Sequence, residues 1–96
     1  MEKHLWYIEL FDCYGKILTL KQQKYFEDYY FDNLTLSEIA DNNEVSRNAI
    51  HKQLKDVESK LLEYEFKLKL HEKSEKINEL LKDVDERIKE EIKELL

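Results

Sequence analysis

The sequence is poor in the residues that interrupt helices: its 96 residues include one glycine and no proline. Their scarcity argues against a turn-rich all-β domain and favours long helices. The single cysteine cannot form a disulfide within the chain, which suits a reducing compartment, so we expect a cytoplasmic protein. The apolar runs are too short for a membrane span or a signal peptide, and we expect no membrane insertion. The length fits one small domain and excludes a Rossmann or barrel enzyme.

The charge is unevenly distributed along the chain. The formal net charge is −6, yet residues 46–60 carry four basic and two acidic side chains and form a net positive stretch. This distribution permits local contact with phosphate but predicts weak general attraction to nucleic acid.

Helices are predicted over residues 3–14, 20–32 and 36–42, and from residue 46 onward. Gly15 stands where the end of the first helix needs a left-handed residue. Thr19 and Thr35 each begin a capping box, because a Gln or Glu follows three residues later. Ser46 can cap the last of these helices. The predicted packing face of the second helix consists of Tyr25, Phe26, Tyr29 and Tyr30.

Two apolar stripes follow in the second half of the chain. The first has heptad spacing and consists of Ile50, Leu54, Val57, Leu61, Tyr64 and Leu68. The second consists of Ile77, Leu81, Val84, Ile88, Ile92 and Leu95. The gap from Leu68 to Ile77 indicates either a helix break or one continuous helix with a stutter, and we prefer the break. Because residues 1–45 look too small to cover both stripes, we expect a homodimer, with residues 1–60 as one domain and residues 61–96 as a dimerisation extension.

Residues 36–55 have the spacing of a helix-turn-helix unit, with a polar turn at residues 42–44. Its predicted core consists of Ile39, Ala40, Val45, Ile50 and Leu54, with Val45 closing the corner. Its predicted outward face, the candidate DNA-binding surface, consists of Arg47, Asn48, His51, Lys52 and Lys55. Arginine and asparagine near the start of such a helix can read base edges in a major groove, and lysine suits phosphate.

These residues carry a family resemblance. Residues 34–40 (LTLSEIA) and 45–50 (VSRNAI) resemble region 4 of bacterial sigma factors of the sigma-70 type. With residues 10–15 (LFDCYG), 18–22 (LTLKQ) and 62–65 (LEYE), the chain is more closely similar to the YlxM-like family of helix-turn-helix proteins. The resemblance implies an all-α, sigma-region-4-like bundle with a helical extension, a dimer, and a regulatory role in the signal recognition particle pathway. At Asn43 and Glu44 the sequence departs from the usual apolar residue and glycine, so a reshaped turn is expected.

No catalytic residue, metal or cofactor is expected, and we predict that the chain is not an enzyme. His4, His51 and His71 are far apart in sequence and lack zinc-ligand spacing. Cys13 is interpreted as a small core residue. The carboxylates alternate with lysines, as ion pairs on solvent-facing helices do.

Three functions remain open from the sequence. The first is a regulator that binds a protein or RNA component of the signal recognition particle. The second is a dimeric, sequence-specific DNA-binding regulator. The third is a structural or adaptor dimer that binds no nucleic acid.

Overall fold

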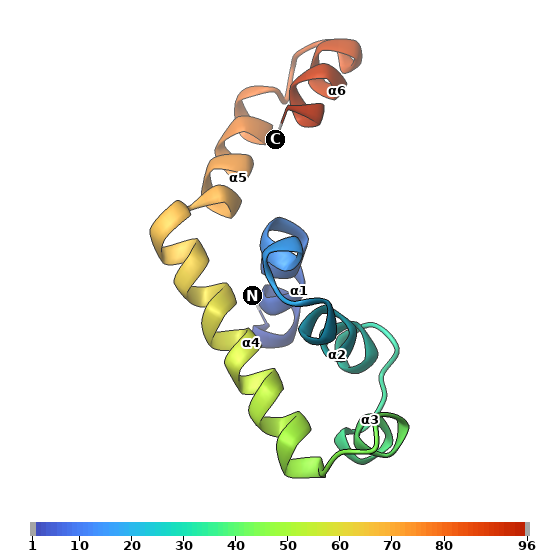
Figure 1. The fold of residues 1–96 in the computed structure, drawn as a ribbon. Coiled ribbons are helices and arrows are strands. Elements are labelled where there is room, and N and C mark those ends of the chain that lie inside the picture. The colour runs from blue at the N-terminus through green and yellow to red at the C-terminus, as the bar shows by residue number, and fades with distance from the viewer. Residues whose placement is uncertain (1, 96) are drawn as a thin grey trace.

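The computed structural model describes residues 2–95, which contain helices and turns and no strand. The helices are α1 (Lys3–Tyr14), the 3-10 turn η1 (Gly15–Ile17), α2 (Leu20–Tyr30), α3 (Leu36–Asn42), α4 (Arg47–Leu68), α5 (Leu70–Leu80) and α6 (Glu86–Glu94). The all-α fold predicted from the sequence is therefore confirmed. Figure 1 shows α1, α2 and α3 along one side of the long helix α4, with α5 and α6 continuing from its far end.

The helix starts follow the predicted capping chemistry. The Thr19 hydroxyl accepts a hydrogen bond from the Gln22 backbone N–H at 3.1 Å, and the Gln22 side chain accepts from the Thr19 N–H at 3.4 Å. Thr35 and Glu38 form the same reciprocal pair at the start of α3, at 3.1 and 2.9 Å. Each box satisfies two amides that a helix start would otherwise leave unpaired.

Gly15 does not adopt the predicted left-handed conformation. Its φ of −53° and ψ of −37° are right-handed helical, and the chain continues directly into η1. Space favours glycine here, because an added Cβ would lie 3.0 Å from Cε2 of Phe11 and the ring would have to shift. Phe11 is held in place by stacking on Phe26, with ring centroids 4.2 Å apart.

Two apolar clusters form the core, and both use α4. The first core cluster consists of Tyr7, Leu10, Tyr14, Leu18, Phe26, Tyr30, Val57 and Leu61. The second core cluster consists of Tyr25, Ile39, Ala40, Ile50 and Leu54. The chain therefore covers the first stripe from Ile50 to Leu61 with its own helices α1, α2 and α3. This corrects the expectation that a second chain is needed to cover these four residues, because three short helices of the same chain cover about three turns of α4.

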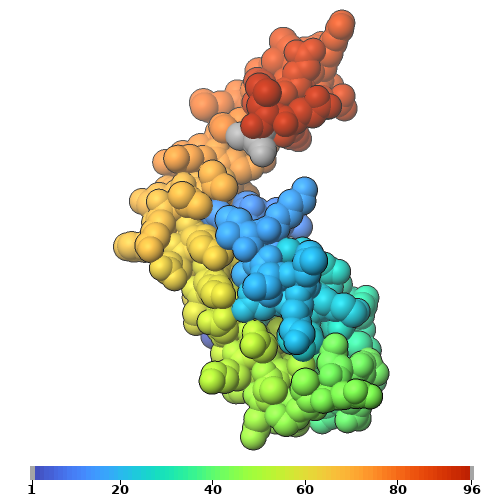
Figure 2. Space-filling model, viewed as in Figure 1, coloured from blue at the N-terminus to red at the C-terminus, as the bar shows by residue number. Residues whose placement is uncertain are grey.

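The break after Leu68 is confirmed, and a second break was not predicted. Lys69 adopts φ 54° and ψ 34°, and α5 begins at the next residue. The stripe from Ile77 to Leu95 is then divided between α5 and α6, whereas the sequence indicated one helix. Helices α5 and α6 extend away from the body of the molecule, whose overall dimensions are 50 × 24 × 24 Å (Figure 2). None of the helices within residues 2–95 combines the length and the apolar character needed to cross a bilayer.

Candidate nucleic-acid interface

The turn between α3 and α4 sets the direction of the candidate recognition helix. The Val45 N–H donates to the Ala40 carbonyl at 3.1 Å, and the Asn43 side-chain amide donates to the Ile39 carbonyl at 2.7 Å. Glu44, between them, has a φ of 55°. The turn thus keeps the left-handed residue typical of this unit, although glutamate costs about 1 kcal/mol there. It is not reshaped.

Val45 does not close the corner of the unit as predicted. Its side chain is 38% exposed and lies outside both core clusters, whereas Ile39 and Ile50 are fully buried. The neighbouring Asn43 instead caps the last turn of α3, because its side-chain amide donates to the Ile39 carbonyl. Directly after Val45, the Ser46 hydroxyl caps α4 by accepting from the Ala49 N–H at 3.1 Å.

The five side chains proposed for DNA contact lie together on the exposed side of α4. We call this surface the recognition face; it consists of Arg47, Asn48, His51, Lys52 and Lys55, all exposed. Within residues 2–95, the side chains of Arg47, Asn48, His51 and Lys52 take part in no hydrogen bond or ion pair of the molecule itself. Lys55 makes a long contact of 3.5 Å with Glu58. The donors on this face are thus available to an external ligand.

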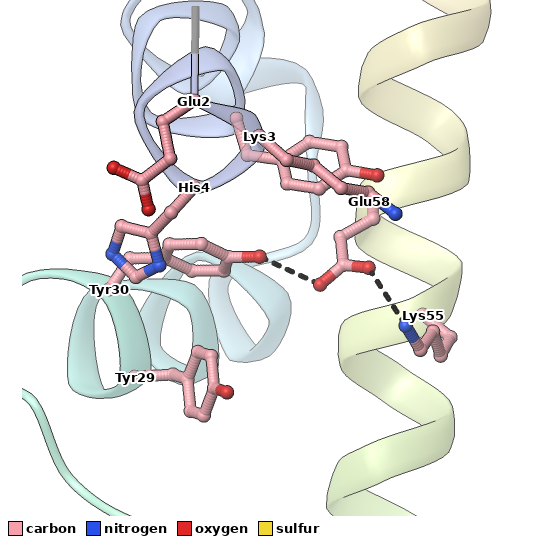
Figure 3. Close-up of a pocket in the computed structure, with 8 residues that line it drawn as sticks. Glu2, Lys3, His4, Tyr29, Tyr30, Lys55 and Glu58 are labelled. Atoms are coloured by element: carbon pink, nitrogen blue, oxygen red, sulfur yellow. Dashed lines mark hydrogen bonds and ion pairs between the residues drawn. The ribbon is translucent and has the colours of Figure 1, made fainter.

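A hollow of about 350 Å³ beside the recognition face is lined in part by Tyr30, Lys55 and Glu58, whose side chains contact one another (Figure 3). The Tyr30 hydroxyl donates to Oε2 of Glu58 at 2.7 Å, while Lys55 contacts Oε1. Burial and then this hydrogen bond raise the pKa of Tyr30 well above its usual range. Because both oxygens of Glu58 already have partners, the carboxylate is poorly placed to act as an acid or base.

Exposed acidic side chains precede the recognition face in the sequence, as expected for a chain with a formal net charge of −6. Glu38, Asp41 and Glu44 lie on α3 and the following turn, and all three are exposed. Hydrogen bonds from Thr35 lower the pKa of Glu38, so this carboxyl group is ionised at neutral pH. These carboxylates therefore place negative charge within a few residues of the recognition face in the sequence.

At its other end, α4 meets α5 in a bend that we call the elbow (residues 68–71). The Glu65 carboxylate accepts hydrogen bonds from the Tyr14 hydroxyl at 2.6 Å and from the His71 and Glu72 N–H groups at 3.0 and 3.2 Å. The Tyr14 oxygen also accepts from the Leu70 N–H at 2.9 Å. A side chain of α4 and a tyrosine of α1 together satisfy the first amides of α5. The sequence did not reveal this arrangement, since Tyr14 and Glu65 are 51 residues apart.

Cys13 and the histidines lie as follows. Cys13 is half-buried and packs against the first core cluster, and burial raises the pKa of its thiol. The ring of His4 packs at a tilt of 43° against the ring of Tyr30, with centroids 4.5 Å apart. His71 lies between α1 and α5, where Glu9 and Glu75 approach it. This last grouping could not be predicted from the sequence, because Glu9 is 62 residues from His71.

The packing of α3 across the start of α4, with an outward basic and amide-bearing face, defines a helix-turn-helix protein. Residues 1–95 match the family described as "UPF0122: Putative helix-turn-helix protein, YlxM / p13 like". The chain belongs to this family.

Curated relatives carry the same family name. A UPF0122 protein of Shouchella clausii is 50% identical over 64 residues, which cover 67% of this chain and 59% of the relative. A UPF0122 protein of Malacoplasma penetrans is 53% identical over 60 residues, covering 62% of this chain and 56% of the relative. The matched part thus spans little more than half of each relative.

Proposed function

We propose that the chain is a non-enzymatic regulatory protein of the cytoplasm that binds B-form DNA through the recognition face. The observation that carries this proposal is the set of four exposed, internally unpaired side chains at the start of α4, among residues 2–95, next to a helix-turn-helix turn. Arg47 and Asn48 lie in the first turn of α4, where such helices reach base edges, and Lys52 and Lys55 lie one and two turns further on, where they suit phosphates.

Duplex DNA fits this face better than duplex RNA. The major groove of B-form DNA is about 12 Å wide and admits a helix, whereas that of A-form RNA is too narrow for side chains to read. The small number of lysines on the recognition face predicts a weak dependence of DNA binding on salt concentration. If Lys52 and Lys55 each neutralise one phosphate, the logarithm of the binding constant should fall with the logarithm of salt concentration with a slope of about −2.

A gel shift with genomic fragments tests the proposal. Arg47→Ala with Lys52→Ala should weaken binding about 10- to 100-fold, since it removes one base contact and one phosphate contact. Lys16→Ala with Lys21→Ala is the matched control, because it removes the same charge from two exposed residues away from the recognition face. Equal binding by the two double variants would exclude the recognition face as the DNA site.

We propose further that the protein acts as a homodimer joined through the extension. In support, Phe66 is 80% exposed and Leu80 is 79% exposed, although both are large and apolar. A hydrophobic side chain of this size gains about 1.5–3 kcal/mol on full burial. A two-fold dimer would bind paired half-sites about 34 Å apart. Sedimentation at tens of micromolar tests the dimer, and a folded monomer at that concentration would contradict it.

The second candidate function is regulation of the signal recognition particle pathway, which the family resemblance implies. The exposed apolar side chains of the extension favour it, because they offer a protein component of the particle a surface separate from the recognition face. Co-purification with the particle should then survive Arg47→Ala with Lys52→Ala. An RNA component would instead give a gel shift with particle RNA and none with DNA. A structural or adaptor dimer would give no signal in either assay.

A further inference from the structure

Three side chains of metal-ligand type converge where α1 meets α5. The Nε2 atom of His71 lies 2.6 Å from Oε2 of Glu9 and 3.8 Å from Oε1 of Glu75. One ligand atom from each residue lies within 4.8 Å of the other two. The edge of the His71 ring also meets Trp6, with centroids 4.8 Å apart and planes at 83°, which restricts the ring orientation.

Hydrogen bonding within the protein does not satisfy both carboxylates. The Nε2 atom carries at most one proton, and in this geometry it can donate only to Glu9. Glu75 at 3.8 Å is beyond hydrogen-bond distance. Two carboxylates therefore face one nitrogen in a chain whose formal net charge is −6. A divalent cation between the three groups would compensate both negative charges.

We propose that Glu9, His71 and Glu75 bind one Zn²⁺ ion. Imidazole nitrogen and carboxylate oxygen are both ordinary zinc ligands, at about 2.0–2.2 Å from the metal. In a tetrahedral site, this places neighbouring ligand atoms about 3.3 Å apart. The distances of 2.6 and 3.8 Å lie on either side of that value, so small rotations of the two glutamates suffice. Water completes the coordination, and the ion joins α5 to α1.

Isothermal titration of the full chain with Zn²⁺ tests the site. We expect one ion per chain, and at least about tenfold weaker binding by Glu75→Gln, as a lost ligand should cost no less than a lost outer-shell partner. Glu75 is exposed, so this variant should fold normally, as circular dichroism can verify. Glu79→Gln is the matched control, since it removes the same charge from an exposed position one turn further along α5.

Cys13 is the competing ligand, because zinc also binds thiolate. Cys13→Ser should leave Zn²⁺ binding unchanged, and the Co²⁺-substituted protein should lack a thiolate-to-metal charge-transfer band. His71→Gln should abolish binding. The proposal is overturned if the wild-type chain takes up no Zn²⁺, if Glu75→Gln binds as tightly as Glu79→Gln, or if Cys13→Ser loses the ion.

Discussion

The elbow offers a sharp test of how the extension is held. Replacing Glu65 by alanine removes the acceptor of three hydrogen bonds, one from the buried Tyr14 hydroxyl and two from the first amides of α5. Losing a side chain that caps a helix start costs about 1 kcal/mol. Leaving the Tyr14 hydroxyl without its charged acceptor costs about 1–3 kcal/mol more. We expect Glu65→Ala to lower the free energy of unfolding by about 2–4 kcal/mol.

Urea unfolding followed by circular dichroism measures this loss. Glu63→Ala is the matched control, because Glu63 lies on the same helix in an exposed pair with Lys67, at 2.9 Å. Exposed pairs of this type contribute about 0.3–0.5 kcal/mol. Both substitutions remove one carboxylate from α4. The difference in the free energy of unfolding between the two variants therefore measures the contribution of burial and of the helix cap.

Tyr14→Phe separates the two contributions. It removes the hydroxyl, which also accepts from the Leu70 N–H, but leaves Glu65 free to accept from the His71 and Glu72 amides. We expect a loss of about 1 kcal/mol. The double variant should lose less than the sum of the single variants, because they share one hydrogen bond. Equal stability of Glu65→Ala and Glu63→Ala, or strict additivity of the double variant, would refute the elbow as a stabilising cap.

Three further predictions follow from single residues. Burial, and then the hydrogen bond to Glu65, raise the pKa of Tyr14 to about 12, so the folded state keeps this proton where the unfolded chain loses it. The contribution of this group to the free energy of unfolding is fully present below about pH 10 and is lost as the pH rises toward 12. Because Tyr14→Phe lacks the hydroxyl, urea unfolding of this variant should show a smaller loss of stability over the same pH range. Glu44→Gly should raise the unfolding free energy by about 1 kcal/mol in the same assay, because φ is 55° at this position. Gly15→Ala should lower it by about 1–2 kcal/mol and reduce the melting temperature, because the new Cβ would meet the ring of Phe11.

The features predicted well from the sequence are those fixed by neighbouring residues. The capping boxes at Thr19 and Thr35 need only a side chain and an amide three residues apart, and both form as expected. The cap of α4 is another such feature, because the Ser46 hydroxyl accepts from the Ala49 N–H three residues later. Local chemistry thus determined most of the helix starts.

The predictions that were wrong concern residues whose role depends on distant neighbours. Gly15 looked like a helix stop, but its conformation follows from the continuation into η1 and from the nearby ring of Phe11. Val45 looked like a core residue from its spacing, but its side chain is 38% exposed and packs in neither core cluster. The stripe from Ile50 to Leu61 has the period of a coiled coil, yet periodicity alone cannot tell whether the covering helices come from the same chain.

Helix α4 connects the recognition face with the elbow. This helix has 22 residues, which corresponds to a length of about 33 Å, with the recognition face at its start and the elbow at its end. Its middle is fixed by Val57 and Leu61 in the first core cluster, so it acts as a rigid connection between the two surfaces. In a dimer joined through the extension, the separation of the two recognition faces would depend on the elbow angle. The hydrogen bonds of the buried Tyr14 and the half-buried Glu65 hold that angle. These two side chains, at the other end of α4 from the recognition face, would therefore determine which half-site spacing the dimer accepts.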